Sequence, residues 1–309
     1  MRGICLHFGT QLLNYFNTWE ESLSTIKYID TGTWHSLWFS DHFLPPYPKL
    51  SLESESALES WSLIAATAAV TNRLRLGILV SGNTYRNPAL LAKMAATVDQ
   101  ISNGRLILGI GAGWFQQEHE AFGWAFPGVK ERCDRLEEAV ELIKMLFTTE
   151  GPINYNGHYY KLKDAYFSPA CTQKPYIPIM VGGSGEKRTL RTLARFGDMA
   201  NIGIGDHGSP EMFRHKLEVI ERHCEELGRD PSEIKKTMAI PLRIENDEEK
   251  AAQLRKHRGE WGLYGSISFI NDRIQKYIDA GAEEIIFSGI KSNPELFKQI
   301  QEEVLSVFQ

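Results

Sequence analysis

The tripeptide Ser40-Asp41-His42 combines an acid and an imidazole directly after an apolar run, Ser36–Ser40, that predicts a strand. An acid beside an imidazole can move protons or hold the heteroatom of a bound ring by hydrogen bonds. The plainer interpretation is that Asp41 caps the following turn and His42 covers the core. The dipeptide alone favours neither interpretation, and its position at the carboxyl end of a strand favours a functional role.

A glycine-rich loop, Gly182-Gly183-Ser184-Gly185, joins a predicted strand, Ile177–Val181, to a predicted helix, Gly185–Phe196. Glycines let backbone N–H groups approach an anion, and a helix N-terminus adds a favourable dipole. The spacing is not that of a P-loop, so the alternative is an ordinary tight turn. Three glycines and a serine in four residues favour phosphate binding.

A second glycine run, Gly109–Gly113, is followed by Trp114. It is only a partial match to a dinucleotide-binding loop, because Trp114 takes the sixth position. These glycines are better explained by a flat ligand or another backbone packing against the strand end. Trp114 and Tyr85, beside the glycine loops, could stack on a planar ring.

No pattern in the sequence indicates a metal site. The histidines His119, His207 and His257 form neither HxH nor HExxH, and no GxSxG elbow is present. The four cysteines are scattered without a CxxC pair, which predicts reduced thiols and a cytoplasmic protein. We therefore expect no bound metal.

Composition limits the partners of this chain. Its 309 residues are 42% hydrophobic and 24% charged, as in a soluble globular protein, and its net charge is −5. Without a basic surplus we expect neither a nucleic-acid nor a membrane partner, and no apolar run reaches 18 residues. A small molecule is the expected substrate.

Short apolar runs alternate with longer amphipathic segments along the whole chain, which predicts βαβ units. The predicted strands are Gly3–Phe8, Ser36–Ser40, Arg73–Val80, Arg105–Gly111, Ile177–Val181, Met199–Ile202, Thr237–Ile244 and Glu284–Phe287. The predicted helices are Trp19–Thr31, Ala57–Val70, Asn87–Ile101, Arg132–Leu146, Gly185–Phe196, Pro210–Leu227, Asp247–Arg255, Ile267–Ala280 and Pro294–Phe308.

Eight such units predict an α/β fold, a (β/α)₈ TIM barrel that occupies residues 1–309 as one domain. An open Rossmann-like sheet is the alternative, but no GxGxxG follows the first strand. Two insertions, His42–Ser56 after the second strand and Thr149–Tyr176 before the fifth, are expected on or near the face where the strands end. The second insertion contains Asn156-Gly157, a hairpin turn signal.

The segment YRNPALLAKMAATVDQISNGRLILGIGAGWFQQEHEAFG (Tyr85–Gly123) resembles the signature stretch of the luciferase-like oxidoreductases, the bacterial luciferase superfamily. SLWFSDHF (Ser36–Phe43), RLRLGILV (Arg73–Val80), NYNGHYY and PIMVGGSGEKRTLRTLARFGDMAN (Pro178–Asn201) agree with it in the same order. The short motifs SDHF, YRNP, GIGAGW and GGSGEK are similar to those of the branch usually classed as dependent on coenzyme F420.

This resemblance implies a barrel that binds a flavin or deazaflavin on its C-terminal face, usually in a homodimer. It places Asp41 and His42 against the ring, and Gln117 in contact with the cofactor. The bulged strand end behind the ring, commonly with a non-prolyl cis peptide, would be Leu79, Val80, Ser81 and Gly82. The phosphate would lie on Gly182, Gly183, Ser184 and Gly185. One departure stands out, because sugar-phosphate dehydrogenases of this superfamily carry a catalytic glutamate where this chain has Trp114.

The prediction is an F420-dependent oxidoreductase that transfers a hydride to or from a small organic substrate. His42 would donate or accept the proton, with its tautomer oriented by Asp41. One alternative is an FMN-dependent two-component monooxygenase supplied by a separate flavin reductase, and another is a non-catalytic flavin-binding relative. The sequence names neither the ring nor the substrate. Alanine-rich segments in Ala57–Val70 and Asn87–Ile101 add support for a homodimer.

Overall fold

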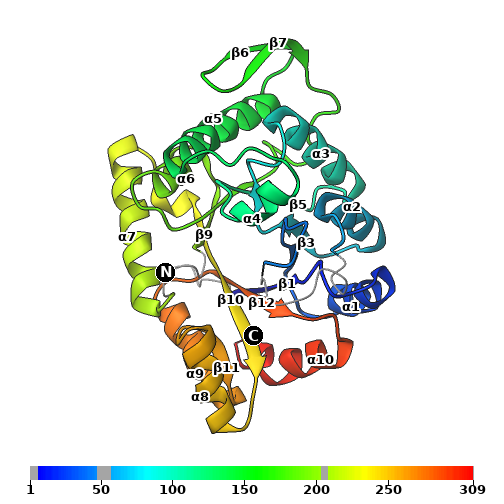
Figure 1. Ribbon diagram of the computed structural model, residues 1–309, viewed down its shortest axis with the longest axis vertical. Coiled ribbons are helices and arrows are strands. Elements are labelled where there is room, and N and C mark those ends of the chain that lie inside the picture. Colours follow the sequence, from blue (N-terminus) through cyan, green and yellow to red (C-terminus); the bar gives the residue numbers. More distant parts are fainter. Residues whose placement is uncertain (1–5, 47–56, 203–207, 309) are drawn as a thin grey trace.

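The computed structural model describes residues 6–46, 57–202 and 208–308. Eight parallel strands form a closed ring in the order β1-β2-β3-β5-β8-β9-β10-β12, and β12 pairs with β1 (Figure 1). The barrel strands are β1 His7–Leu12, β2 Ser36–Phe39, β3 Arg75–Ile78, β5 Leu106–Gly111, β8 Ile179–Gly182, β9 Met199–Ile202, β10 Lys235–Ile244 and β12 Glu284–Ile290. The predicted (β/α)₈ barrel is confirmed.

Helices surround the ring. They are α1 Trp19–Thr31, α2 Ser60–Val70, α3 Pro88–Ile101, α4 Gln116–Ala121, α5 Val129–Thr148, α6 Thr189–Phe196, α7 Pro210–Leu227, α8 Glu248–Arg258, α9 Ile267–Asp279 and α10 Pro294–Glu303. Short strands β4 Ser81–Gly82 and β11 Leu263–Gly265 extend the sheet, and β6 Pro152–Asn156 pairs with β7 Lys161–Tyr166 apart from it.

Local sequence signals account for the best-predicted helix ends. Thr18 and Glu21 form a capping box at the start of α1. Ser209 caps α7 before a proline at its first position, and Gly228 ends α7 in the left-handed conformation. The predicted limits of α1, α7 and β9 are therefore confirmed to the residue.

The structure differs from the prediction at the first strand. Gly3–Cys5 lie outside the described residues, and β1 continues to Leu12 instead of ending at Phe8. The continuation depends on Gly9, where a Cβ would lie 2.2 Å from the Ser36 hydroxyl oxygen. Strands β11 and β4 and helix α4 are short and were not predicted, and α6 begins at Thr189, four residues after the predicted start.

The inside of the barrel is filled by side chains, not open. Trp38 is fully buried there with a small apolar cluster that includes Ile107, Met180 and Ile286. Gly77 provides the space for Trp38, since a Cβ at that position would lie 2.3 Å from the indole. The larger core lies between the strands and the helices.

Polar groups close the barrel near the amino ends of its strands. Glu284, fully buried, accepts hydrogen bonds from Ser36 and from Lys235, the latter with an N–O distance of 2.5 Å. The rings of His7 and His35 stack with centroids 3.9 Å apart. Burial is the main cause that lowers the pKa of His35 to about 4.

The two predicted insertions have different outcomes. Residues 47–56 of the first lie outside the described residues. The second does form the predicted hairpin of β6 and β7, joined by residues 157–160, and it packs on the outside of α5 (Figure 1). Only its loop reaches toward the C-terminal edge of the barrel, where the Asn83 amide donates to the Tyr160 hydroxyl at 3.1 Å.

Candidate functional site

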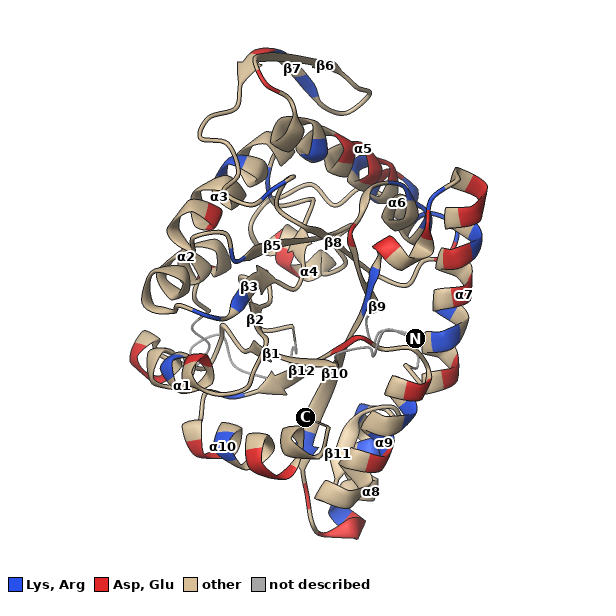
Figure 2. Cartoon of the chain, turned by 180° about the vertical axis from the view of Figure 1, so that it is seen from behind, with Lys and Arg blue, Asp and Glu red and all other residues tan. Residues whose placement is uncertain are grey.

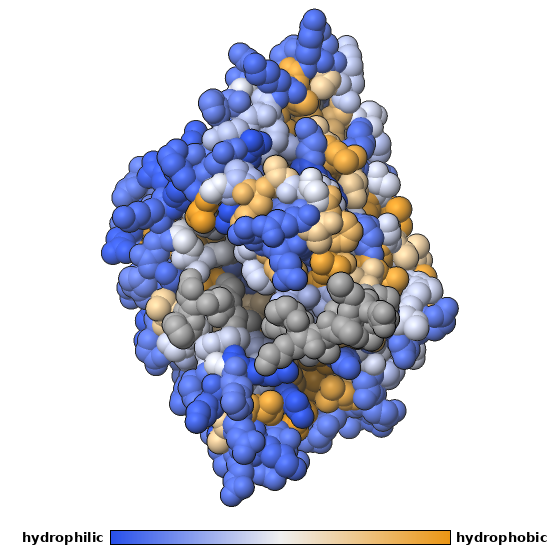
Figure 3. Space-filling model, in the orientation of Figure 1, coloured by the Kyte–Doolittle hydropathy of each residue, from blue (hydrophilic) through white to orange (hydrophobic). Residues whose placement is uncertain are grey.

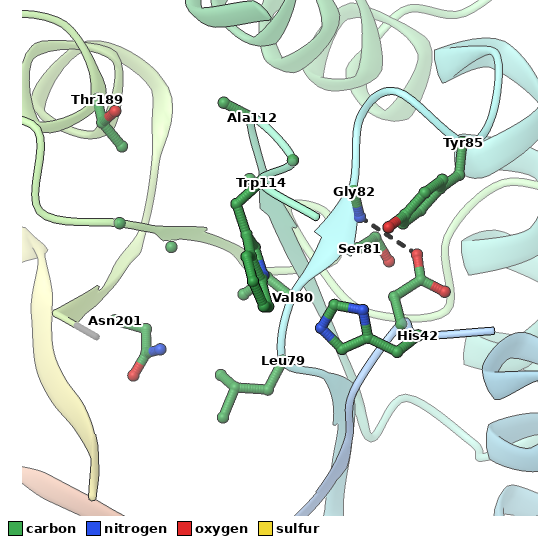
Figure 4. Close-up of a pocket in the computed structure, with 15 residues that line it drawn as sticks. His42, Leu79, Val80, Ser81, Gly82, Tyr85, Ala112, Trp114, Thr189 and Asn201 are labelled. Atoms are coloured by element: carbon green, nitrogen blue, oxygen red, sulfur yellow. Dashed lines mark hydrogen bonds between the residues drawn. The ribbon is translucent and has the colours of Figure 1, made fainter. Parts of the chain in front are cut away.

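A cavity of about 320 Å³ opens at the carboxyl ends of β2, β3, β5, β8 and β9 (Figure 4). This volume is at the lower end of the usual range for small-molecule sites. The lining residues are Asp41, His42, Leu79, Val80, Ser81, Gly82, Tyr85, Gly111, Ala112, Gly113, Trp114, Gly182, Gly183, Thr189 and Asn201. Asp41 and His42 therefore meet residues of both glycine loops in one cavity, as expected for strand ends on one face of a barrel.

The end of the third strand bends into the cavity. The peptide bond between Leu79 and Val80 is cis, as the family resemblance implied. Beyond it, Ser81 and Gly82 form β4, which pairs with β5 at Ile110 and Gly111. This bend directs Val80 toward the ends of the neighbouring strands.

Glycines make room for that bend. A Cβ at Gly182 would lie 2.8 Å from both methyl carbons of Val80, and one at Gly111 would lie 2.8 Å from one of them. A Cβ at Gly109 would lie 2.0 Å from the carbonyl oxygen of Ile78. Gly109, Gly111 and Gly182 are thus required by close packing of another strand end, which the partial dinucleotide motif had indicated for Gly109 and Gly111.

Glu118 of α4 is the carboxylate that contacts His42. Its Oε2 lies 3.3 Å from His42 Nδ1, and its Oε1 accepts hydrogen bonds from the backbone N–H groups of Phe43 (2.6 Å) and Leu44 (2.8 Å). The Tyr85 hydroxyl also donates to Oε2. Glu118 is fully buried, so it holds the ring of His42 and the chain that follows it in one arrangement.

Burial alone would raise the pKa of Glu118, but hydrogen bonds from His42 and Tyr85 outweigh it and hold that pKa below its usual value. An ionised carboxylate can only accept, so Nδ1 of His42 carries the proton and Nε2 is left as the other functional atom. The expectation that Asp41 orients His42 is wrong, because the orienting acid is Glu118, 76 residues away in the chain.

Asp41 points in another direction, toward Arg86 and β4. Its Oδ2 accepts hydrogen bonds from Arg86 Nη1 (2.6 Å) and from the backbone N–H of Gly82 (3.2 Å). Arg86 also binds Glu59 at 2.7 Å. Burial raises the pKa of Asp41 to about 6, although Arg86 opposes that rise. Its Oδ1 is buried and has no hydrogen-bond partner.

The two aromatic candidates beside the glycine loops behave differently. Tyr85 stacks on His119 at 4.7 Å, and burial raises its pKa. Its ring is therefore packed within the protein. Trp114 remains 63% exposed inside the rim of the cavity. Of the two candidates, Trp114 is the one whose side chain is largely open to a ligand.

Some predicted site residues lie outside the lining. Gln117 is exposed on α4, and it is the neighbouring Glu118 that turns inward. In the glycine loop, Gly182 and Gly183 line the cavity, whereas Ser184 and Gly185 do not. The later start of α6 separates the loop from the helix N-terminus, and places Thr189 beside the cavity instead.

Asn201, the next-to-last residue of β9, is a lining residue that sequence reasoning missed. It is 6% exposed and its Oδ1 is buried without a partner. A polar residue within the apolar run Met199–Ile202 was the available signal, because a buried amide in a strand needs a hydrogen-bonding group opposite it.

Among the described residues, no group of three or more His, Cys, Asp or Glu side chains is arranged to hold a metal ion. His119 contacts the Phe115 carbonyl and the Thr84 hydroxyl, each at 2.7 Å. His257 lies on α8, and His207 lies outside the described residues. In the same part of the chain, no helix has the length and apolar character needed to cross a membrane.

Known proteins with similar sequences and structures place this chain in a family. The F420-dependent glucose-6-phosphate dehydrogenase of Amycolatopsis mediterranei (strain U-32) is 29% identical over 87% of this chain and 89% of its own length. Pyrimidine monooxygenase RutA of Allorhizobium ampelinum is 31% identical over 61% of this chain and 51% of its own length. A solved F420-dependent secondary alcohol dehydrogenase, in complex with an F420-acetone adduct, has a TM-score of 0.84 at 20% identity and covers 98% of this chain and 99% of its own. Since the family model described as luciferase-like monooxygenase matches residues 2–303, the chain belongs to that family.

Proposed function

We propose that this chain is an F420-dependent oxidoreductase that transfers a hydride to or from a small organic substrate. The observation that carries the proposal is the cavity at the C-terminal edge, where His42 faces the cis peptide of Leu79 and Val80 (Figure 4). The relationship to an F420-dependent dehydrogenase along most of both chains supports it.

The cavity suits a flat, polar ring. Asp41 Oδ1 and Asn201 Oδ1 are buried acceptors without partners, and both residues line the cavity. Unpaired buried acceptors are costly, so a ligand that presents N–H or O–H donors would stabilise both. The ring of a deazaflavin has such donors.

The residues that would hold the cofactor follow from this arrangement. Leu79, Val80, Ser81 and Gly82 would support the ring from behind, and Asp41 and Asn201 would bind its edge. Gly182 and Gly183 would bind the phosphate through backbone groups. Contacts from Gln117, Ser184 and Gly185 are further predictions, and these three lie outside the present lining of the cavity.

When bound, the deazaflavin supplies a hydride carrier that has carbon where a flavin has N5 and does not use O₂ as a flavin does. The chain supplies the proton chemistry. Glu118 holds Nδ1 of His42, which leaves Nε2 to take a proton from, or give one to, the oxygen of the substrate.

The alternative is an FMN-dependent monooxygenase that receives reduced flavin from a separate reductase, and similarity to a pyrimidine monooxygenase favours it. A titration of apo-protein with F420 and with FMN, followed by fluorescence, separates the two. We expect F420 to bind at least about tenfold more tightly, a difference of about 1.4 kcal/mol. Tighter binding of FMN, with O₂ consumption in the presence of a flavin reductase, would overturn the proposal. The buried contact of His42 with Glu118 argues against the third alternative, a non-catalytic relative.

We further propose a homodimer that docks through α2 and α3. Helix α2 carries no charged residue, whereas Lys, Arg, Asp and Glu cover α5, α7 and α10 (Figure 2). Apolar side chains gather at the right-hand edge of Figure 3, on the side where Figure 1 places these two helices. Most of the alanines of α3 pack inward, but Val70, Leu90 and Ile101 remain 37%, 54% and 44% exposed. Light scattering at micromolar concentration tests this, and a monomer mass would contradict it.

The last part of the proposal concerns the domain organisation, the cellular location and the partners of the enzyme. We propose that residues 1–309 are one domain that works in the cytoplasm on a small molecule, without a nucleic-acid or membrane partner. The net charge of −5 supports the absence of nucleic-acid and membrane partners, and the scattered cysteines support the cytoplasm. Fractionation of cells that express the tagged chain is the direct test, and recovery with the membrane fraction would contradict it.

A further inference from the structure

Trp114 is a large aromatic side chain that the fold presents to the cavity instead of burying. Its indole is 63% exposed. It stacks on Phe115, with ring centroids 5.2 Å apart, and it meets the edge of His42 at 5.3 Å. In Figure 4 the indole projects into the cavity on the side of Val80 and His42. One face of the indole is therefore covered by Phe115, and the side chain remains open toward a ligand.

The chain before Trp114 holds it in this place. Gly113 has a φ of +80°, a conformation that L side chains rarely adopt. A Cβ there would also lie 2.6 Å from the hydroxyl oxygen of Thr84. The turn at Gly113 therefore helps to direct the indole into the cavity, together with its contacts to Phe115 and His42.

The charges around the cavity are also informative. Within the described ranges, the lining contains one carboxylate, Asp41, and one imidazole, His42, but no Lys or Arg. Arg86 contacts Asp41 from behind and is already bound by two carboxylates, those of Asp41 and Glu59. A phosphate carried by the substrate would therefore meet no free cation in the described lining, and the backbone groups of Gly182 and Gly183 are assigned to the phosphate of the cofactor.

The remaining lining near the indole is apolar. Ala112, two residues before Trp114, lines the cavity and is not among the residues assigned to the cofactor. Such a surface gains free energy by covering an apolar group, and an indole gains more when that group is a flat ring. Since its ring lies 5.3 Å from that of His42, a group stacked on Trp114 can place an attached oxygen at the imidazole.

We propose that the substrate of this site is an uncharged compound with an aromatic ring or another flat apolar face next to a hydroxyl or carbonyl group, and not a phosphorylated sugar. Trp114 binds the flat face, and His42 binds the oxygen. This inference rests on the proposed function for the presence of a hydride carrier, but the recognition of the substrate is decided by Trp114 and the apolar lining.

The test is calorimetric titration of the F420-loaded protein with three probes: 1-phenylethanol, benzyl alcohol and glucose 6-phosphate. The variants are Trp114→Ala, Trp114→Phe and the matched control Tyr166→Ala, which removes a 73% exposed aromatic side chain on β7. We expect the wild type to bind both aromatic alcohols and to bind glucose 6-phosphate at least about tenfold more weakly. We expect Trp114→Ala to weaken binding of the alcohols about tenfold, Trp114→Phe less, and Tyr166→Ala not at all.

Equal or tighter binding of glucose 6-phosphate by the wild type would overturn the inference. So would failure of both alcohols to bind, or an unchanged affinity in Trp114→Ala. The titration with F420 alone is made first and tests the proposed function separately. If F420 does not bind, the proposed function fails, and the same three probes are then titrated into FMN-loaded protein, where the same outcomes decide the inference.

Discussion

Replacing Glu118 by glutamine should reverse the tautomer of His42 while leaving the fold in place. The amide oxygen can keep the position of Oε1 and accept from the Phe43 and Leu44 N–H groups, at 2.6 and 2.8 Å in the native protein. The amide NH₂ then replaces Oε2, which lies 3.3 Å from His42 Nδ1. A donor at that point requires Nδ1 to accept, so the ring proton moves to Nε2, the atom left for the cavity.

The size of the effect follows from which groups lose a partner. The Tyr85 hydroxyl, which donates to Oε2 in the native protein, loses its acceptor, and this costs about 1–3 kcal/mol of unfolding free energy. A His42 that carries its proton on Nε2 can no longer accept one from the substrate. Turnover in the direction that oxidises the substrate should fall by about 10²–10⁴-fold, the range for loss of a general base or its correct tautomer.

Two measurements check this prediction. Long-range ¹⁵N–¹H spectra of ¹⁵N-histidine-labelled protein report which nitrogen carries the proton, and His42→Gln identifies the signal of His42. Turnover with F420 and the best alcohol probe gives the rate. The control is Glu120→Gln on the same helix, whose exposed carboxylate accepts a hydrogen bond from the Gln116 amide. An unchanged tautomer, or turnover within about threefold of the wild type, would refute the role assigned to Glu118.

Three other perturbations should have distinct outcomes. Gly183→Val should lower F420 affinity about tenfold or more with an unchanged circular dichroism spectrum, because Gly183 has a φ of +128°; unchanged affinity would remove the phosphate assignment. His42→Gln should keep F420 affinity but lower turnover about a hundredfold or more, whereas retained turnover would make His42 a packing residue. The folded state holds the pKa of His35 near 4, below its value of 6.5 in the unfolded chain, so the unfolded state binds more protons and stability should fall as pH decreases from 6.5 toward 4. In urea titrations, the free energy of unfolding should fall by roughly 1–2 kcal/mol over this pH range, a value discounted for the partial exposure of His35. This fall should be absent in His35→Gln, and equal pH profiles of the two proteins would contradict the prediction.

Local patterns were sufficient for the architecture. Alternating apolar runs and amphipathic segments predicted the strand and helix order, and the predicted ends of α7 are those that Ser209 and Gly228 cap in the structure. These signals act between neighbours in the chain, so the sequence carries them directly. Errors occurred where packing overrides the local signal, as at β1, which continues through Gly9 because that glycine fits beneath Ser36.

The order of the strands, the glycine loops and the acid–imidazole pair at a strand end were therefore properties of the sequence by itself. Only the tertiary structure decided how those residues work together. It brought Glu118 to His42 across 76 residues, turned Asp41 toward Arg86, and left Trp114 exposed while Tyr85 was packed. Contacts of this kind depend on how distant segments pack around a closed barrel, and residue spacing along the chain carries no information about the direction in which a side chain points there.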